Sequence, residues 1–364
     1  SRSDYGILKH FYKKIDLSSF FSFSILVTGS HHSKIFGSSY QEIKIDNFKN
    51  IINIKTNFDN NHVSHLTNSI SLIYDKFSSI LLKNKPDLII MLGDRFELIP
   101  FAHLAVMHKI KILHIHGGEI TDGSMDNVFR NAISAMSNFH FVSNSNSLKL
   151  LQNIYYIDDV FNIGSMAINS ILKTKFLSRN AISKKINFTF AKSIFVILFH
   201  PNTISNKTDM EVRELLKSLV RYNEISLIFI SPNADPGSNI IFREFTKFIK
   251  SNKNSTFIKN LNSYDFYSLV KISNLLIGNS SSGLIEIPSI GTPTINIGER
   301  QHGRLKSNSV INSNFDEKEI TKSIKLGLSA YFVNKIKINN NNPYFKKNSI
   351  DLAMSYLKII SKRI

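Results

Sequence analysis

A segment rich in hydroxyl groups follows a short apolar run at residues 277–286, with the sequence IGNSSSGLIE. The run predicts a strand that ends at Gly278 and passes into a helix that begins near Ser280. The unpaired N–H groups of a helix start, together with serine hydroxyls and a glycine that allows close approach, suit a phosphate. Serine also caps helices without any ligand, but the acid Glu286 would accept hydrogen bonds from ribose hydroxyls, which favours a nucleotide. The residues of this predicted site are Ser280, Ser281, Ser282, Gly283 and Glu286.

Acids and histidines end or follow two neighbouring predicted strands, 87–93 and 110–116. Asp94 comes directly after the first strand. His114 and His116 are two residues apart and share one face of the second, and Glu119 follows it. Because the carboxyl ends of parallel strands meet at the same edge of a sheet, we expect these side chains to converge. Carboxylates and imidazoles are the groups that most often transfer protons in enzymes.

These residues also have simpler explanations. Asp126 and Arg130 are four apart on the helix predicted at 126–137, so they would pair on one face, and alone such a pair would be a surface ion pair. His114 could be a buried histidine with satisfied hydrogen bonds. His114, His116 and a carboxylate would also suit zinc. No extended ligand signature supports zinc, and we predict neither a metal site nor a cofactor.

Two loops in the second half of the chain follow predicted strands. His200 ends the run SIFVILFH, where a histidine would contact a diphosphate as a cation or donate a proton to it. The loop SPNADPGS, residues 231–238, lies at an equivalent strand end, although its composition also fits an ordinary turn.

Short apolar runs alternate with longer amphipathic stretches along the chain. Nearly continuous apolar runs are typical of parallel strands covered on both faces, and the alternation predicts doubly wound α/β domains. The predicted strands are 23–28, 87–93, 110–116, 139–143, 160–164, 193–199, 225–231, 255–260, 274–278 and 293–298. The predicted helices include 63–83, 97–108, 126–137, 208–222 and 238–251.

The composition excludes several classes of protein. The chain has 364 residues and is 42% hydrophobic, enough for two domains with buried cores. It has no cysteine, which excludes disulfides and cysteine-bound metals. Its net charge of +18 is spread along the chain without any nucleic-acid-binding pattern, so we expect no nucleic-acid partner. No apolar run is long enough to cross a bilayer and the start does not resemble a signal peptide, so we expect a cytoplasmic protein without a membrane partner.

A polar and basic stretch near residues 165–190 divides the series of strands. We predict an N-terminal Rossmann-like domain at 1–166 and a C-terminal nucleotide-binding domain at 167–343. The last segment, 344–364, is predicted to be a helix that crosses back to the first domain. In two such domains the cleft between them is the expected ligand site.

The motifs of the chain resemble, in order, those of the hydrolysing UDP-N-acetylglucosamine 2-epimerases, which act at the head of bacterial sialic acid synthesis. The resemblance covers nearly the whole chain, and the order of the motifs is more specific than any one of them. It implies the glycosyltransferase-B architecture, two Rossmann-like domains around a cleft. The motifs are SRSDYG, VTGSH, LGDRFE, HIHGGE, DNVFR, NADPGS, GNSSSGLIE and INIGERQHGR.

The resemblance implies a reaction in which a proton leaves C2 of the sugar, UDP leaves C1, and water adds to the resulting glucal to give free N-acetylmannosamine. The catalytic residues that it implies are Asp94, His116, Glu119, Asp126 and His200. The division of roles between His116 and Glu119 stays open, because the animal branch has a glutamate at the position of His116. The residues that it implies for UDP binding are Arg2, Arg95, His200, Asn233, Ser280, Ser281, Gly283, Glu286 and Arg300.

Alternatives remain within the same fold. Close relatives act on UDP-2,4-diacetamido-2,4,6-trideoxyglucose or its GDP counterpart in the legionaminic acid route, and the motifs fit that sugar as well. A non-hydrolysing epimerase, which the segment HGGE argues against, and a glycosyltransferase are further alternatives. The resemblance also implies a homodimer or homotetramer. In the family a strand precedes the motif SRSDYG, so we expect the central strand of the first domain upstream of residue 1, or else a degraded gene and an inactive protein.

Overall fold

The structure, a computed structural model, describes residues 2–32, 40–56, 63–122, 124–202, 207–232, 235 and 237–364, without the side chains of Arg2, Ser3 and Val63. The chain divides into two compact units. Unit 1 comprises Ser1–Ile120, Met125–Asn169 and Tyr344–Ile364, and unit 2 comprises Thr121–Ser124 and Ser170–Pro343. The C-terminal segment therefore returns to unit 1, whereas a short segment between two parts of unit 1 belongs to unit 2.

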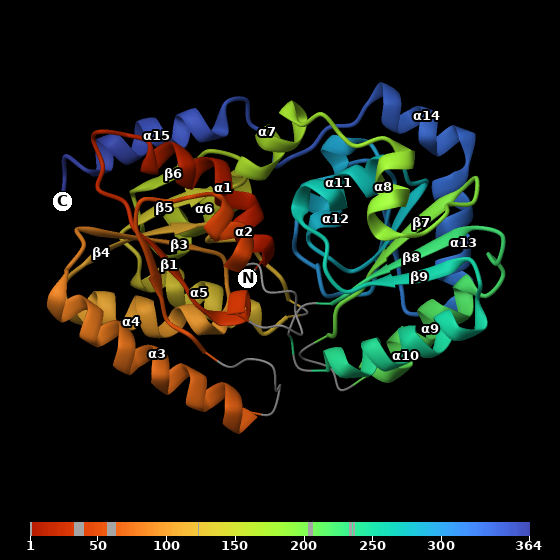
Figure 1. The fold of residues 1–364 in the computed structure, drawn as a ribbon. Coiled ribbons are helices and arrows are strands. Elements are labelled where there is room, and N and C mark those ends of the chain that lie inside the picture. Colours follow the sequence, from red (N-terminus) through yellow and green to blue (C-terminus); the bar gives the residue numbers. More distant parts are fainter. Residues whose placement is uncertain are drawn as a thin grey trace. The chain divides into compact units, whose positions relative to one another are not determined.

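Unit 2 is built on a sheet of six parallel strands in the order β12-β11-β10-β7-β8-β9 (Figure 1). Counted from β7, this is the strand order of a Rossmann fold, in which the direction of strand addition reverses between β7 and β10. Strands β7 and β8 are buried along their whole length, because helices cover both of their faces. The strands are β7 (Ile194–Leu198), β8 (Ser226–Ile230), β9 (Ser255–Ile258), β10 (Leu275–Gly278), β11 (Thr294–Ile297) and β12 (Val310–Ser313).

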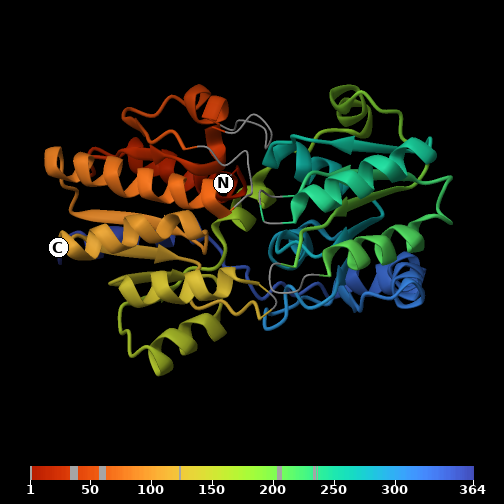
Figure 2. The same ribbon diagram turned by 90° about the horizontal axis from the view of Figure 1, so that it is seen from below.

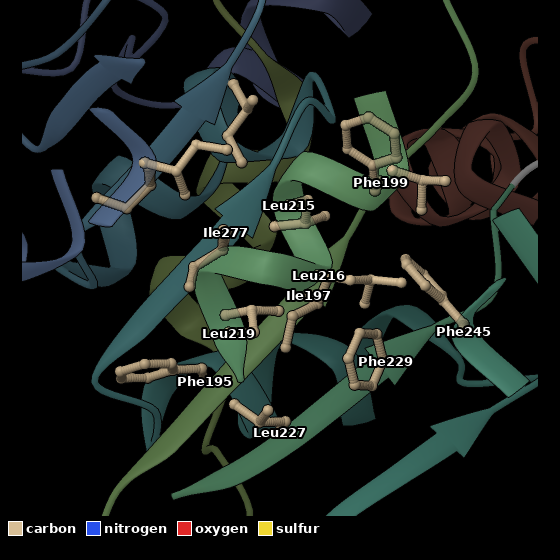
Figure 3. Close-up of a cluster of buried hydrophobic side chains, with 14 of the residues drawn as sticks. Phe195, Ile197, Phe199, Leu215, Leu216, Leu219, Leu227, Phe229, Phe245 and Ile277 are labelled. Carbon is tan, nitrogen blue, oxygen red and sulfur yellow. The ribbon is translucent and has the colours of Figure 1, made fainter. Parts of the chain in front are cut away.

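The helices of unit 2 pack their apolar sides on this sheet. Figure 3 shows β7 and β8 contributing aromatic and aliphatic side chains that meet those of α9 and α10. Burying a side chain of this size contributes about 1.5–3 kcal/mol, so the cluster fixes the central strands and the loops that follow them. The helices are α8 (Arg179–Ile186), α9 (Thr208–Leu219), α10 (Ser238–Ser251), α11 (Ser263–Lys271), α12 (Ser282–Ile285), α13 (Glu317–Leu328) and α14 (Ala330–Ile338), with a 3₁₀ turn η3 (Ile287–Ile290).

Unit 1 contains two parallel sheets that are hydrogen-bonded separately. The first pairs β1 (Ile25–Val27) with β2 (Ile51–Asn53). The second has the order β3-β4-β5-β6. No ladder joins β1 to β3 within the described part of the chain, so each of these two strands has one edge without a paired strand there. The strands of the second sheet are β3 (Leu88–Leu92), β4 (Lys111–Ile115), β5 (Phe139–Val142) and β6 (Val160–Asn162).

Helices cover both faces of the sheets in unit 1. On one face α1 (Arg2–Asp16) lies beside α15 (Ser349–Ile360), and their apolar residues pack on β3, β4 and β5 (Figure 1). On the other face α3 (Val63–Lys83), α4 (Ile99–Met107) and α5 (Asp126–Met136) lie side by side (Figure 2). The other helices are α2 (Tyr40–Ile45), α6 (Ser145–Ile154) and α7 (Met166–Lys173), with 3₁₀ turns η1 (Gly29–His32) and η2 (Phe96–Leu98).

The predicted elements agree with this structure except for the ends of the strands, two additional strands and the start of one helix. Every predicted strand is present, most with one or two residues fewer at their ends. Strands β2 and β12 were not predicted, because both are short and lie among Asn, Lys and Ser residues. The helix predicted at 97–108 begins as the turn η2, and α4 starts at Ile99 with Pro100 in its first turn. Within the described ranges, no helix combines the length and apolar character needed to span a membrane.

Candidate active site

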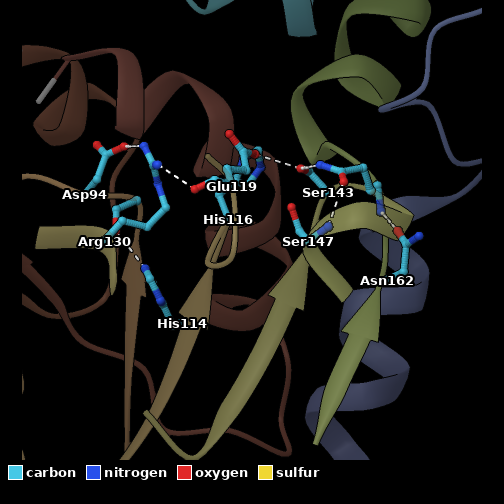
Figure 4. A network of polar contacts seen from close by, with 11 residues as sticks. Asp94, His114, His116, Glu119, Arg130, Ser143, Ser147 and Asn162 are labelled. Atoms are coloured by element: carbon cyan, nitrogen blue, oxygen red, sulfur yellow. Dashed lines mark hydrogen bonds and ion pairs between the residues drawn. The ribbon is translucent and has the colours of Figure 1, made fainter. Parts of the chain in front are cut away.

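Asp94 and Arg130 form an ion pair at the carboxyl end of the second sheet of unit 1 (Figure 4). Asp94 follows β3 directly, and Arg130 projects from α5. Arg130 is 1% exposed and also donates hydrogen bonds to the backbone oxygen of Glu119, at 2.7 Å, and to Oδ1 of Asn127, at 3.3 Å. A planar guanidinium with several fixed donors orients its partners. Arg130 therefore joins the loop after β3 to the loop after β4.

Asp94 is a partner of Arg130 that the sequence did not indicate. Asp126 was expected to pair with Arg130 across one helical turn, with a surface ion pair as the simpler explanation. Arg130 is buried, and its ion pair with Asp94 joins residues 36 positions apart. Asp126 is the first residue of α5 and is half-buried.

His116 and Glu119 form a second couple at the end of β4 (Figure 4). The Nδ1 atom of His116 lies 3.0 Å from Oε1 of Glu119, and the hydroxyl of Ser143 donates to the same oxygen at 2.7 Å. Asn144 donates to Oγ of Ser143 at 3.1 Å. Because a carboxylate oxygen accepts, Nδ1 of His116 carries the hydrogen, and the free electron pair of the neutral ring is then at Nε2.

Two features of His116 are typical of a functional residue. Its backbone has a φ of 63°, an uncommon left-handed conformation for a residue other than glycine. Its Nε2 atom is buried and has no hydrogen-bond partner within the described residues. A buried polar atom of this kind is costly unless something else uses it. We therefore regard Nε2 as the atom of this couple that is available to exchange a proton.

His114 and His140 are buried beneath these two couples. They are paired in register on β4 and β5, with ring centroids 5.9 Å apart. Burial lowers the pKa of His114 to about 4. Burial, followed by the neighbouring His114, lowers the pKa of His140 to about 3. Both rings are therefore neutral near pH 7. His114 is fully buried and hydrogen-bonded, as the simpler explanation required.

In unit 2 several of the predicted site residues follow β7 and β10. These are the neighbouring strands between which the direction of strand addition reverses. The side chain of Asn279 accepts a hydrogen bond from the backbone N–H of His200 at 2.7 Å and donates one to its carbonyl at 2.8 Å. Gln301 in turn donates to the carbonyl of Asn279 at 2.9 Å. Ligands of this fold bind beyond the strand ends at such a switch point. Asn279 therefore ties the loop after β7 to the loop after β10.

The serine-rich segment differs from its predicted form. Ser280 precedes the helix rather than starting it, and α12 has only one turn, Ser282–Ile285. Because a helix of one turn sums few peptide dipoles, α12 contributes little positive charge at this position. The hydroxyls of Ser280 and Ser282 lie 3.0 Å apart, and Ser281 between them is half-buried.

Two further residues of this segment are buried. A Cβ at Gly283 would meet Cγ2 of Thr294 on β11 at 2.8 Å, so the glycine is needed for close packing on the sheet. Glu286 is 4% exposed and follows α12. Burial and the nearby charge of Glu286 raise the pKa of Tyr267 well above its usual value.

Arg300 and Asp235 bring a third loop of unit 2 to the site. Their side chains are both nearly buried, and Nη2 of Arg300 lies 3.6 Å from Oδ2 of Asp235. Asp235 follows β8, so this ion pair joins the chain after β8 to Arg300.

The remaining predicted residues belong to unit 1 or lie outside the described residues. Arg95 belongs to unit 1, where its Nε donates to Glu97 at 3.3 Å and its guanidinium lies over the ring of Phe96. The side chain of Arg2 and the whole of Asn233 lie outside the described residues. The structure adds four residues that the sequence analysis missed, of which Asn279 alone had a signal, its place directly after a glycine that ends a strand. These residues are Ser143, Asp235, Asn279 and Gln301.

Comparison with known proteins identifies the family. The family model described as UDP-N-acetylglucosamine 2-epimerase matches residues 13–358. The chain belongs to the UDP-N-acetylglucosamine 2-epimerase family. It is 34% identical over 98% of its length to the polysialic acid biosynthesis protein P7 of Escherichia coli, of which 92% is covered. It is 36% identical over 87% of its length to a hydrolysing GDP/UDP-N,N'-diacetylbacillosamine 2-epimerase of Campylobacter jejuni, of which 83% is covered.

A solved member of this epimerase family has the same fold. The UDP-N-acetylglucosamine 2-epimerase of Neisseria meningitidis, bound to UDP-N-acetylglucosamine, matches with a TM-score of 0.82 at 17% identity, covering 98% of this chain and 97% of that one. The predicted fold class, two Rossmann-like domains of the glycosyltransferase-B type, is confirmed. The prediction of a hydrolysing nucleotide-sugar 2-epimerase agrees with the family and with the name of the Campylobacter relative.

Proposed function

We propose that this epimerase converts UDP-N-acetylglucosamine and water to UDP and free N-acetylmannosamine, for the synthesis of sialic acid-type surface sugars. The observation that carries the proposal is the convergence of Asp94, His116 and Glu119 at one sheet edge of unit 1. Two proton transfers at C2 need at least one base and one acid. Arg130 pairs with Asp94 and also donates to the backbone oxygen of Glu119, so it fixes the positions of both acids. Such proton transfers require a fixed geometry.

The proposed reaction has two stages. In the first, a base takes the proton from C2, the electron pair forms the C1–C2 double bond, and UDP leaves C1 with the bonding pair. In the second, hydroxide from water bonds to C1 and a proton is delivered to C2 on the opposite face. Asp94 and the His116–Glu119 couple are the proposed proton carriers, with Glu119 orienting His116 through Nδ1. Asp126 at the start of α5 is retained as a further candidate.

The residues of unit 2 are proposed to hold the UDP. His200 and Arg300 supply positive charge or hydrogen-bond donors for the diphosphate, and Ser280 and Ser281 supply hydroxyls. Glu286 is proposed to accept hydrogen bonds from the ribose. Arg2, Arg95 and Asn233 are retained as UDP-binding candidates on the resemblance alone.

The relative from Campylobacter favours a second substrate, because its name gives a GDP- or UDP-linked diacetamido sugar. The two substrates differ at C4 and C6 of the sugar, away from the C1–C2 chemistry, so the same proton carriers would serve both.

Incubation of the protein with each nucleotide sugar in deuterated water tests the proposal. We expect free UDP and N-acetylmannosamine with deuterium at C2, detected by NMR. Accumulation of UDP-N-acetylmannosamine would indicate a non-hydrolysing epimerase. Transfer to an acceptor without C2 deuterium would indicate a glycosyltransferase. Release of no nucleotide from either sugar would overturn the proposal.

Glu286→Gln tests the proposed ribose contact. The change keeps the volume of the buried side chain but removes the charge. Because hydrogen bonds to charged groups contribute about 1.5–3 kcal/mol, we expect UDP to bind roughly 10- to 100-fold more weakly, measured by calorimetry. The affinity for 2',3'-dideoxy-UDP, which lacks both hydroxyls, should change little. An equal loss for both nucleotides would show that Glu286 acts through the fold instead of the ribose.

A further inference from the structure

The ring of His114 contacts the backbone that carries Asp94. Its Nε2 atom lies 2.7 Å from the carbonyl oxygen of Gly93, and its Nδ1 atom lies 3.0 Å from Oγ of Ser134. A carbonyl oxygen only accepts, so Nε2 carries the hydrogen. In the neutral ring Nδ1 then accepts from the hydroxyl of Ser134. Both hydrogen bonds together select one tautomer.

The carbonyl of Gly93, which His114 contacts, lies beyond the hydrogen-bonded ladder of β3. The N–H of Gly93 makes the last ladder bond of β3, to the carbonyl of Ile115 at 2.9 Å. Gly93 then has a φ of 79°, and the chain turns away from the ladder. Its carbonyl belongs to the same peptide plane as the N–H of Asp94. The hydrogen bond from His114 therefore sets the direction in which the chain enters Asp94.

The same helix holds Asp94 at two points. Arg130 and Ser134 are four residues apart on α5 and so lie on one face. Arg130 pairs with the carboxylate of Asp94, and Ser134 orients His114, which holds the preceding peptide. Gly117 leaves room for this contact, since a Cβ there would meet both Nδ1 of His114 and Oγ of Ser134 at 2.8 Å.

We propose that His114 is a positioning residue for Asp94, acting as a neutral Nε2–H donor to the carbonyl of Gly93. The inference rests on the catalytic role of Asp94 in the proposed function. His114 does not touch the substrate, and its effect passes through the peptide between residues 93 and 94.

Four variants test this role against a purely structural one. His114→Leu removes the donor, and His114→Gln restores an N–H group near the position of Nε2. His140→Leu and His140→Gln are the matched controls, since His140 is the neighbouring buried histidine and is paired with His114 in the register of β4 and β5.

We expect His114→Leu to lower kcat by about 10- to 100-fold with KM nearly unchanged, because a displacement of ~1 Å in a catalytic group has effects of this size. His114→Gln should recover most of the loss. The two His140 variants should keep the kcat of the native protein, whatever they cost in stability. Equal losses in the Leu variants at 114 and 140, or no recovery with Gln, would overturn the proposal.

A readout without turnover separates this inference from the proposed function. In the resting protein, nitrogen-15 NMR of the ring should show a protonated Nε2 and an unprotonated Nδ1 at His114. The backbone amide signal of Asp94 should shift in His114→Leu but not in His140→Leu. The opposite tautomer, or an unmoved Asp94 signal, would overturn the positioning role even in a protein that proved to turn over no sugar. Absent turnover with the expected NMR result would instead count against the proposed function alone.

Discussion

Asp94→Asn should lower kcat by about 10²- to 10⁴-fold, the range that general acid–base groups contribute. Asparagine fills the same space and still offers an oxygen to Arg130, but it cannot exchange the C2 proton. A group that acts mainly in the transition state changes turnover far more than binding. UDP affinity measured by calorimetry should therefore stay within about threefold, because the loss is one of transition-state stabilisation.

The stability of this variant must be followed alongside its activity. Removing one partner of a fully buried ion pair costs roughly 3–5 kcal/mol, and the side chain of Asp94 is 22% exposed, so we expect a smaller loss in the free energy of unfolding. Asp75→Asn, an exposed acid paired with Lys76, is the control for loss of one negative charge. If Asp94→Asn weakened UDP binding as Glu286→Gln does and left kcat intact, the division of roles between these two acids would be wrong.

Gly278→Ala should unfold unit 2 or leave it barely stable. A Cβ at this position would lie 1.9 Å from the carbonyl oxygen of Leu198 on β7, and Gly278 has a φ of 149° that other residues rarely adopt. Leu198 is its partner in the register of β10 and β7, the two strands at the centre of the sheet. Neither backbone can move without breaking the ladder. We expect a loss of about 4 kcal/mol or more, which is exceptional for a single substitution.

Gly291→Ala is the matched control for this variant. Gly291 also has a positive φ, of 83°, but a Cβ there would meet no atom within 4 Å. Gly291→Ala should lower the free energy of unfolding by about 1–2 kcal/mol, the conformational cost of a positive φ in a residue with a Cβ. Denaturant unfolding of both variants measures the difference. Equal losses would mean that the contact between Gly278 and Leu198 is relieved by a small shift, and that β10 is less tightly fixed than its register indicates.

The sequence predicts the elements of this fold well because their apolar runs are long. Strands such as β7 and β8 are buried on both faces, and their runs of five and four consecutive apolar residues predict buried parallel strands. The rule that the carboxyl ends of parallel strands meet at one edge predicts that Asp94, His116 and Glu119 lie together. Strand order could not be predicted, because it depends on which strands pair over long distances in sequence.

The contacts within the site were less predictable for a related reason. Helical spacing suggests that Arg130 pairs with Asp126, four residues away, and gives no hint of Asp94, 36 residues away. The short length of α12 did have a signal in the sequence. Pro288 has no N–H group to donate to the carbonyl four residues before it, which predicts that a regular α-helix from Ser280 is interrupted there. Side-chain anchors such as Ser143 and Gln301 carry no pattern of their own, because serine and glutamine occur in most loops.

The separation of the two sheets in unit 1 has a consequence for how this unit opens. Among the described strands, β1 and β2 pair only with each other, whereas β4 and β5 lie inside a ladder of four strands. The bridge between the sheets is made of side chains: Tyr5 of α1 packs on Ile25 and Val27, while Leu8 and Phe11 of the same helix pack on the larger sheet. Amide hydrogen exchange should therefore show the smaller sheet opening as its own cooperative unit, at a lower free energy than the larger one. Opening of the smaller sheet alone would then leave Asp94 and its partners in place.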